Sequence, residues 1–340
     1  MKALMYMGPR RIEIQEIDRP SCGPDEALIK VEAVGICGSD LGGYLGHHAR
    51  RQAGLVLGHE LAGTVVELGA NAAGAEIGDR VCVNPLFSCG VCENCRGGRP
   101  NLCAQWRLLG MDRVQGAMAE YVCAPVSALR PLSDGTGPVR GACVEPLACA
   151  VHILSLAPAA PFSSLLIIGA GTQGALIALL ARQLGYGTIV NVDVNPRRLE
   201  AVTELAGIDA AINPRESDLD SAIRGIFGPA GADIAIDAVG STVARDQAMR
   251  YCRSGGDVLF MGLAEQRSDL DVITMIRKEQ RLIGSFAYAD RDFSAAQRLI
   301  ETGAADFSRW TETLGLEQGP EAFHRLTTDP GATLKIVLQP

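Results

Sequence analysis

The chain has 340 residues, of which 47% are hydrophobic and 21% are charged, and its formal net charge is -8 at pH 7. This length exceeds the usual size of one hydrophobic core, so we expect two domains. The acidic balance argues against nucleic acid or an anionic membrane surface as the main partner. No continuous run of 18 apolar residues is present, and residues 1–30 lack the basic and apolar pattern of a secretory signal. We therefore expect a cytoplasmic protein that acts on a small molecule.

Short strands separated by turns are expected over residues 1–145. Ile29, Val31 and Ala33 alternate with Lys30 and Glu32, which is the two-residue period of a half-buried strand. Turns rich in Gly, Pro and Asp separate such segments along this part of the chain. The pattern predicts a mostly-β domain.

Strand and helix patterns alternate from about residue 163 onward. Helices are expected at Gln173–Leu184 and after Asn195, which would cap a helix that ends at Gly207. Six strands with helices between them predict an α/β fold with a doubly wound parallel sheet. The expected strands are Leu165–Ile168, Thr188–Val192, Ala210–Ile212, Asp233–Ala238, Val258–Met261 and Leu282–Phe286.

A glycine pattern that is typical of dinucleotide binding follows the first of these strands. Gly169, Gly171 and Gly174 would provide a tight turn, close approach of the backbone to the pyrophosphate, and packing of the helix on the strand. The helix that begins there offers free amides to the phosphates. Asp193 follows the next strand and would bind the adenosine ribose, which favours NAD. The residues expected to bind the cofactor here are Gly169, Gly171, Thr172, Gln173, Gly174, Asp193 and Arg198, and Arg197 and Arg198 could soften the preference for NAD.

Four cysteines lie within one short, glycine-rich segment. Such a cluster in a reducing compartment is more often a metal site than a set of disulfides. Four thiolates at this spacing can close a tetrahedral shell around zinc and leave no position open for substrate. We interpret the segment as a structural zinc site, with Cys89, Cys92, Cys95 and Cys103 as ligands.

A second set of metal-ligating residues is spread over three segments. Cys37 stands in Gly-Ile-Cys-Gly-Ser-Asp, His59 and Glu60 follow Gly58, and Glu145 precedes a proline. A catalytic zinc needs three protein ligands and one exchangeable position, which this set can supply. Spacing alone leaves ordinary packing of these side chains as an equal alternative.

Together and in this order, the motifs resemble those of the zinc-containing medium-chain dehydrogenase/reductase superfamily, in particular its sorbitol and threonine dehydrogenase branch. The resemblance covers the whole chain and includes Gly116-x2-Ala119-Glu120-Tyr121 and Gly255-Gly256. It implies a GroES-like catalytic domain made of residues 1–145 and 287–340. A Rossmann NAD-binding domain of residues 146–286 would be inserted in it.

The resemblance also implies roles for the residues of the second set. Cys37 and His59 would bind the catalytic zinc, and either Glu60 or Glu145 would complete the ligand set. Ser39 matches the hydroxyl that connects the substrate oxygen to a proton relay. Two further correspondences are Asp40, which would orient His59, and Lys335, which would lie near the cofactor pyrophosphate.

One position departs from the family pattern. Many relatives carry a histidine as the outer end of the proton relay, where this chain has Gly42. The proton would then leave through the cofactor ribose and water, or through a histidine of the following loop. We expect that loop, with His47, His48, Arg50 and Arg51, to be solvated.

The resulting expectation is a zinc-dependent oxidoreductase that transfers hydride between a secondary alcohol and NAD. Polyols, cyclitols, sugar alcohols and amino alcohols all remain open as substrates. The alternatives are a non-catalytic scaffold or redox sensor that binds NAD and zinc, and an NADPH-dependent carbonyl reductase. Family precedent implies a homodimer or homotetramer.

Overall fold

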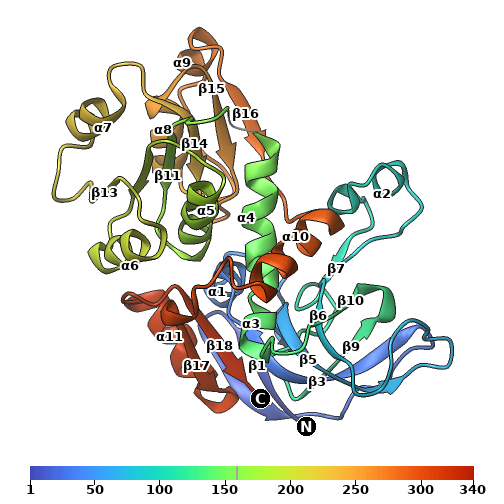
Figure 1. Ribbon diagram of the computed structural model, residues 1–340. Coiled ribbons are helices and arrows are strands. Elements are labelled where there is room, and N and C mark those ends of the chain that lie inside the picture. The colour runs from blue at the N-terminus through green and yellow to red at the C-terminus, as the bar shows by residue number, and fades with distance from the viewer. Residues whose placement is uncertain (158–159) are drawn as a thin grey trace. The chain divides into compact units, whose positions relative to one another are not determined.

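The computed structural model describes residues 1–157 and 160–340, which form two compact units (Figure 1). Unit 1 consists of Met1–Ala148, Tyr288–Pro330 and Lys335–Pro340. Unit 2 consists of Cys149–Ala287 and Gly331–Leu334. The chain therefore leaves unit 1 to build most of unit 2, returns to unit 1, and contributes four more residues to unit 2 before it ends in unit 1.

Unit 1 is built on a seven-stranded sheet with the order β10-β6-β5-β3-β18-β17, and β9 also pairs with β3. The C-terminal strand β18 pairs with β3 through Val337 and Gly35, so residues from both ends of the chain share this sheet. The strands are β3 (Glu26–Gly35), β5 (Glu60–Leu68), β6 (Arg80–Val83), β9 (Tyr121–Pro125), β10 (Leu129–Pro131), β17 (Thr311–Gly315) and β18 (Lys335–Gln339).

Two smaller sheets and several short helices complete unit 1. The small sheets have the orders β2-β1-β4 and β7-β8. Their strands are β1 (Lys2–Gly8), β2 (Arg11–Glu16), β4 (Leu55–Val56), β7 (Leu86–Phe87) and β8 (Arg107–Leu108). The α-helices are α1 (Gly38–Tyr44), α2 (Glu93–Arg96), α3 (Pro138–Ala142), α10 (Asp290–Glu301) and α11 (Gly319–Thr328), and α4 (Val144–Leu156) begins in this unit. The 3-10 helices are η1 (Pro100–Leu102), η2 (Val126–Ala128), η3 (Ser308–Trp310) and η4 (Leu316–Gln318).

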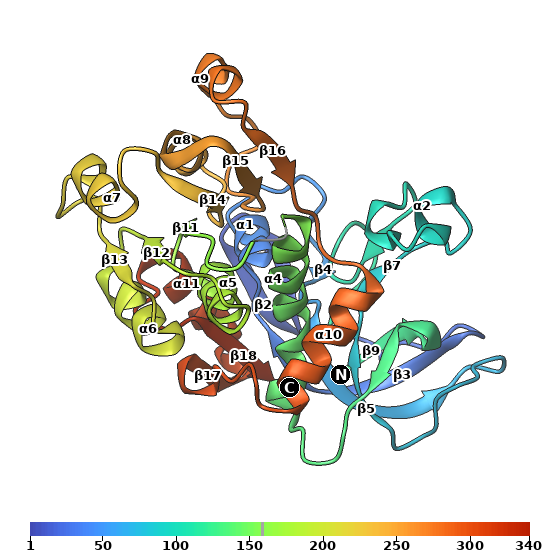
Figure 2. The ribbon, with the colours of Figure 1, turned by 45° about the horizontal axis from the view of Figure 1, so that its top comes forward.

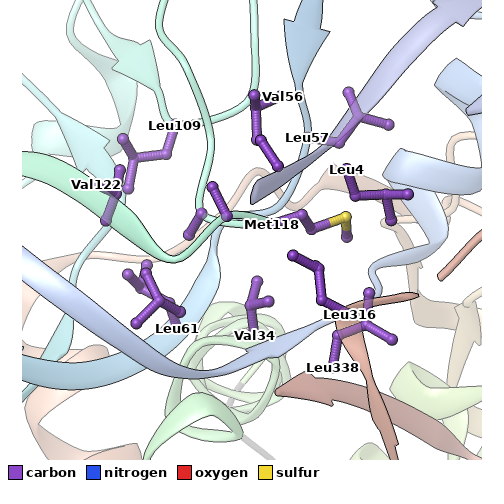
Figure 3. Packing of buried hydrophobic residues seen from close by; sticks show 14 of the residues in the cluster. Leu4, Val34, Val56, Leu57, Leu61, Leu109, Met118, Val122, Leu316 and Leu338 are labelled. Carbon is purple, nitrogen blue, oxygen red and sulfur yellow. The ribbon is translucent and has the colours of Figure 1, made fainter. Parts of the chain in front are cut away.

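Alternating burial along the strands produces the core of unit 1. Along β3 the buried residues are interrupted by exposed Lys30 and partly buried Glu32, as the two-residue period predicts. Figure 3 shows Met118 at the centre of the core, with Val34 and Leu57 around it. The side chains of Met118 and Val34 both lie close to Gly58, the residue before His59.

Unit 2 contains a six-stranded parallel sheet with the order β13-β12-β11-β14-β15-β16, which confirms the predicted doubly wound α/β fold. All four residues of the first strand are buried, as expected for a strand covered on both faces. The strands are β11 (Leu165–Ile168), β12 (Ile189–Val192), β13 (Ala210–Ile212), β14 (Ala232–Asp237), β15 (Cys252–Phe260) and β16 (Arg281–Gly284). The helices are α5 (Thr172–Gln183), α6 (Pro196–Ala206), α7 (Leu219–Phe227), α8 (Thr242–Tyr251) and α9 (Val272–Arg277).

Most elements of unit 2 lie within one or two residues of their predicted bounds. Asn195 caps α6 by accepting from the amides of Arg197 and Arg198, and Gly207 ends this helix in the left-handed conformation, both as predicted. The main difference is β15, which begins at Cys252 rather than at Val258.

One stretch of the described residues, Pro138–Leu156, is long and apolar enough to cross a membrane by length and composition alone, with a mean hydropathy of 1.4. The sequence had suggested no such segment, because Arg140 and Glu145 interrupt the apolar run. Inside the protein 67% of this window is buried, as in the core helix of a globular protein.

Candidate functional site

The structure brings together three of the four side chains predicted to surround a catalytic metal. The ligand atoms of Cys37, His59 and Glu60 lie within 4.8 Å of one another. Cys37 is the N-cap residue of α1, and Glu60 is the first residue of β5. Sulfur, imidazole nitrogen and carboxylate oxygen form a donor set that suits zinc and leaves a position for substrate.

The electrostatics of these side chains also favour a cation. Burial, followed by the negative charges of Glu60 and Asp40, raises the pKa of the Cys37 thiol to about 11. A divalent cation beside the thiol would reverse this effect, because a coordinated thiol loses its proton. The residues present therefore fit a metal ion.

The position of His59 depends on a glycine and on a distant backbone segment. Gly58 has a φ of +93°, and a Cβ atom there would lie 2.7 Å from the Met118 side chain. The amides of Ala117 and Met118 donate to the carbonyls of Gly58 and Leu57, both at 2.9 Å. The glycine-containing segment around residue 116 thus serves to hold the turn that presents His59.

Glu60 lies directly opposite Gly35 across the β3–β5 ladder. A Cβ atom on Gly35 would come within 2.0 Å of Glu60 Oε2, so the glycine provides the space for this carboxylate. Both oxygens of Glu60 accept from Lys335 Nζ, at 2.8 and 2.7 Å, and the same ammonium donates to the Ile36 carbonyl at 3.0 Å.

The contacts of Lys335 differ from those that the resemblance implied. The sequence placed it near the cofactor pyrophosphate, but the structure buries it to 3% exposure within unit 1, against Glu60. Burial lowers the pKa of Lys335, but the charges of Glu60 and Cys37 outweigh this effect and hold the pKa above its usual value. The charge of the ammonium is thus balanced by Glu60, which favours a role in holding this carboxylate over a contact with the pyrophosphate.

Glu145, the other candidate for third ligand, lies outside the group formed by Cys37, His59 and Glu60. It occupies the first turn of α4 and is buried. Burial raises its pKa to about 8, although the charge of His59 opposes the shift. A carboxyl with this pKa is protonated near neutrality unless a cation binds beside it.

Asp40 connects the sulfur and imidazole sides of the site. Its Oδ2 accepts from the Cys37 amide at 3.1 Å, and its Oδ1 lies 3.7 Å from His59 Nδ1. The second distance is too long for a direct hydrogen bond but places the carboxylate where it can orient the ring. Asp40 therefore lies where the sequence predicted a residue that orients His59.

The expectation of a solvated loop after α1 is wrong for Arg51. Its guanidinium lies inside the protein and pairs with Asp40 Oδ1 at 2.8 Å. By contrast, Arg50 is partly exposed, pairs with Asp112 and lies 3.9 Å from the centre of the Trp106 ring. The exception arises because Gly43 has no side chain, so the stem of Arg51 can pass over α1.

The two histidines of the loop differ in their surroundings. His47 is exposed, whereas His48 is partly buried. Burial, followed by the charges of Arg51 and Arg50, lowers the pKa of His48. His48 is therefore neutral at pH 7, as a proton acceptor must be.

The four cysteines of the predicted structural zinc site come together in the loop around α2. Their sulfurs lie within 4.8 Å of one another, and Cys95 Sγ is 3.4 Å from Cys92 Sγ and 3.9 Å from Cys89 Sγ. Sulfurs bound to one tetrahedral zinc ion at about 2.3 Å would lie about 3.8 Å apart, so the group fits the metal. The amides of Val91 and Cys92 lower the pKa of Cys89 to about 6, which favours a thiolate there. The loop projects from the rest of unit 1 in both views (Figures 1 and 2).

The three glycines of the dinucleotide pattern differ in backbone conformation and in the space around them. Gly169 has a φ of +109°, and a Cβ on Gly174 would lie 1.8 Å from the Gly169 carbonyl oxygen. A Cβ on Gly171 would meet only Arg198 Nη1, at 3.7 Å. The fold itself thus requires the first and third glycines, whereas the space beside Gly171 is open.

Asp193 follows β12 and is held by the loops on either side of it. Its Oδ2 accepts from the Ala170 amide at 2.6 Å, and its Oδ1 accepts from the Asn195 amide at 2.8 Å. Arg198 extends toward Gly171, and burial lowers its pKa. Thr172 and Gln173 open α5, and the Thr172 hydroxyl donates to the Leu334 carbonyl.

Comparison with known proteins gives two family matches and full-length relatives. The family described as Alcohol dehydrogenase GroES-like domain matches residues 23–134, and the one described as Zinc-binding dehydrogenase matches residues 174–302. Sorbitol dehydrogenase of Bacillus subtilis (strain 168) is 32% identical over 100% of this chain and 97% of its own length. The chain belongs to the zinc-binding dehydrogenase family. It is an oxidoreductase of the medium-chain superfamily, within the sorbitol-like branch, as its motifs predicted.

Two further relatives agree with this assignment. L-galactonate-5-dehydrogenase of Escherichia coli (strain K12) is 33% identical over 89% of this chain and 88% of its own length. A structure from Sinorhizobium meliloti 1021, assigned as a zinc-binding dehydrogenase and bound to NADP, has a TM-score of 0.90 at 31% identity and covers 100% of this chain and 99% of its own. The predicted combination of a GroES-like domain with a Rossmann sheet is confirmed.

Proposed function

We propose that this zinc-binding dehydrogenase oxidises a secondary alcohol of a polyol or sugar acid and transfers the hydride to NAD. One observation carries the proposal: the ligand atoms of Cys37, His59 and Glu60 lie within 4.8 Å of one another, in a chain that also has the dinucleotide loop. A scaffold or redox sensor would need the four-cysteine site but not this second group.

Zinc held by these residues would supply a Lewis acid that lowers the pKa of the substrate hydroxyl. The chain's own residues then hold and move the proton. Ser39, two residues after Cys37, would accept a hydrogen bond from the substrate hydroxyl and pass its own proton outward. Asp40 would keep the His59 ring in the orientation needed for binding.

We propose Glu60 as the third protein ligand and Glu145 as a carboxyl that can replace it. The proximity of Glu60 to Cys37 and His59 supports this assignment. Its ion pair with Lys335 opposes it, because an ammonium that holds both oxygens weakens the carboxylate as a metal ligand. Ligand exchange between the two glutamates during turnover is compatible with both observations.

The proposal of NAD rather than NADP rests on Asp193. A carboxylate at the end of the second strand binds ribose hydroxyls and repels a 2′-phosphate. Arg198 works in the opposite direction, and the relative from S. meliloti was solved with NADP. Comparing the rates with the two cofactors tests this assignment and the alternative of an NADPH-dependent reductase.

The names of the relatives support sugar-derived substrates. Two of them act on sorbitol and L-galactonate, both of which carry several adjacent hydroxyl groups. We extend this class to the present chain, with cyclitols and amino alcohols as further members of a substrate panel. We further propose that the enzyme is a cytoplasmic homodimer or homotetramer, which sedimentation analysis would test.

The testing experiment combines metal analysis with a substrate screen. Zinc per chain is measured, and formation of reduced nicotinamide is followed with polyols, sugar acids, cyclitols and amino alcohols. We expect one zinc for each of the two ligand groups and turnover of one substrate class. Cys37→Ser should abolish turnover and leave NAD binding intact; turnover by this variant at the wild-type rate would exclude the proposed role of the metal.

A further inference from the structure

Arg51 is a buried cation beside the candidate active site. Its guanidinium has 0% side-chain exposure and pairs with Asp40 Oδ1 at 2.8 Å. It also donates to the Ser39 carbonyl, to Ser39 Oγ at 3.2 Å and to the Gly110 carbonyl at 3.2 Å. One planar group therefore connects the predicted relay hydroxyl, the carboxylate beside His59 and a separate loop.

The fold provides space for this side chain at a cost in helix propensity. Gly43 lies within α1, and a Cβ there would come within 2.3 Å of Arg51 Cδ. Its φ is not in the left-handed region, so the backbone alone would accept alanine. At Gly42, the preceding residue, a Cβ would meet nothing within 4 Å. The requirement for glycine at position 43 thus comes from Arg51.

The chemistry of a guanidinium decides what these contacts do to Ser39. Arginine donates hydrogen bonds and does not lose its proton in proteins, so it accepts none from Ser39. By donating to Ser39 Oγ it occupies one of the two acceptor positions of the hydroxyl. The Ser39 hydroxyl therefore keeps one acceptor position and its own proton. A relay requires both, because the hydroxyl must accept a hydrogen bond from the substrate and donate its proton onward.

Asp40 receives the same guanidinium on Oδ1, the oxygen that lies 3.7 Å from His59 Nδ1. Its other oxygen accepts from the Cys37 amide. Arg51 therefore holds a carboxylate that contacts the backbone of Cys37 and lies beside the His59 imidazole.

We propose that Arg51 is a positioning residue that sets the orientation of the Ser39 hydroxyl for proton transfer and of Asp40 for His59. The inference rests on the proposed dehydrogenase function and deepens it, because it names the group that orients the relay hydroxyl. Arg51 itself carries no proton and does not replace the histidine that is absent at position 42.

The first test compares Arg51→Met with Arg50→Met, the same change at the neighbouring, partly exposed arginine. We expect Arg51→Met to lower kcat by about 10- to 100-fold and to weaken zinc retention against a chelator, as loss of a group behind metal ligands does. Arg50→Met should stay within about threefold of wild type, as expected for a surface ion pair. Equal kcat and zinc retention in Arg51→Met and wild type would overturn the proposal.

A conservative variant separates charge from geometry. Arg51→Lys keeps a cation for Asp40 but lacks the planar fork that also reaches Ser39. We expect nearly normal zinc retention, a lowered kcat and a larger solvent deuterium isotope effect on kcat, since proton transfer would limit the rate. A purely structural role would lower the melting temperature without changing the isotope effect, and that result would also overturn the proposal.

Glycine variants keep the test usable if Arg51→Met does not fold. Gly43→Ala removes no polar group but displaces the Arg51 side chain. Gly42→Ala raises the helix propensity of α1 by the same amount, and its added methyl group contacts nothing. Gly43→Ala should lower kcat in the same direction as Arg51→Met, and Gly42→Ala should retain the wild-type zinc content and isotope effect. Equal behaviour of the two alanine variants would contradict the proposal.

Zinc retention distinguishes failure of this inference from failure of the proposed function. If wild type oxidises no alcohol of the panel, the proposed function fails. The difference in zinc retention between Arg51→Met and Arg50→Met would still show whether Arg51 supports the metal ligands.

Discussion

At the scale of single residues, the site depends on side chains that are absent as much as on those that are present. Gly35, Gly43 and Gly58 each leave space that a neighbouring functional group or core side chain fills. Two of these glycines have ordinary φ values, so the packed neighbour, rather than the backbone, excludes a larger residue there.

Gly35→Ala tests this reading at Glu60. The added Cβ would lie 2.0 Å from Glu60 Oε2, so the carboxylate must move away from Cys37 and His59. We expect zinc affinity or kcat/KM to fall by about 10-fold or more. Gly284→Ala is the matched control, because this strand glycine has open space around it. Unchanged zinc affinity in Gly35→Ala would show that the position of Glu60 does not matter.

Lys335→Met tests the role of this lysine as the partner of Glu60. Removing the ammonium leaves Glu60 buried without its partner, which costs about 3–5 kcal/mol of stability when no metal is bound. Zinc should restore more stability to the variant than to wild type, because the cation replaces the missing charge. Thermal unfolding with and without zinc measures the difference.

Measuring the NAD affinity of the same variant distinguishes a role at Glu60 from a role near the cofactor pyrophosphate. If Lys335 acts on Glu60 alone, NAD should bind to Lys335→Met as it binds to wild type. A large loss of NAD affinity with an unchanged response to zinc would restore the original assignment near the pyrophosphate.

At the scale of elements, the loop that opens α5 contains two glycines that the fold requires and one, Gly171, that packing does not require. Gly174 packs against the Gly169 carbonyl, whereas Gly171 faces open space near Arg198. Side chains at these two positions should therefore have different effects.

Gly174→Ala should lower stability by about 1–3 kcal/mol, as overpacking does. Gly171→Ala should leave the melting temperature nearly unchanged and weaken NAD binding by about 10-fold, because the methyl group occupies the approach to the pyrophosphate. Thermal unfolding and a fluorescence titration of reduced nicotinamide provide the two measurements. Normal NAD binding by Gly171→Ala would exclude this loop as the phosphate site.

At the scale of the whole molecule, the candidate metal and cofactor sites are divided between the two units. Unit 1 contains both groups of metal-ligating residues, and unit 2 contains the glycine loop with Asp193. Loss of the four-cysteine site should therefore lower the stability of unit 1 and leave NAD binding by unit 2 unchanged.

Cys95→Ser, which removes one sulfur of the α2 loop, tests this separation. We expect a loss of at least about 2 kcal/mol, or roughly 4–8 °C in melting temperature for a unit of this size, together with loss of one zinc. NAD binding should persist. Full zinc content and unchanged stability in Cys95→Ser would exclude a structural zinc in this loop.

The sequence by itself determined the features that depend on neighbouring residues. The order of strands and helices in unit 2, the cap at Asn195 and the need for glycine at positions 169 and 174 follow from short-range patterns with one physical solution. The clustering of four cysteines follows in the same way, since ligands so close in sequence need only a short loop to meet.

Only the tertiary structure decided which distant groups meet. Lys335 pairs with Glu60 across 275 positions of sequence, and the sequence had assigned it elsewhere. Arg51 reads as one of two adjacent loop arginines, and only the packing of its stem over Gly43 shows that it is buried and its neighbour is not. The proximity of Glu60 to Cys37 and His59 likewise depends on long-range pairing, since β3 and β5 set the position of Glu60 opposite Gly35. The physical reason is that burial and ion pairing depend on which surfaces pack together, and short-range patterns do not encode that.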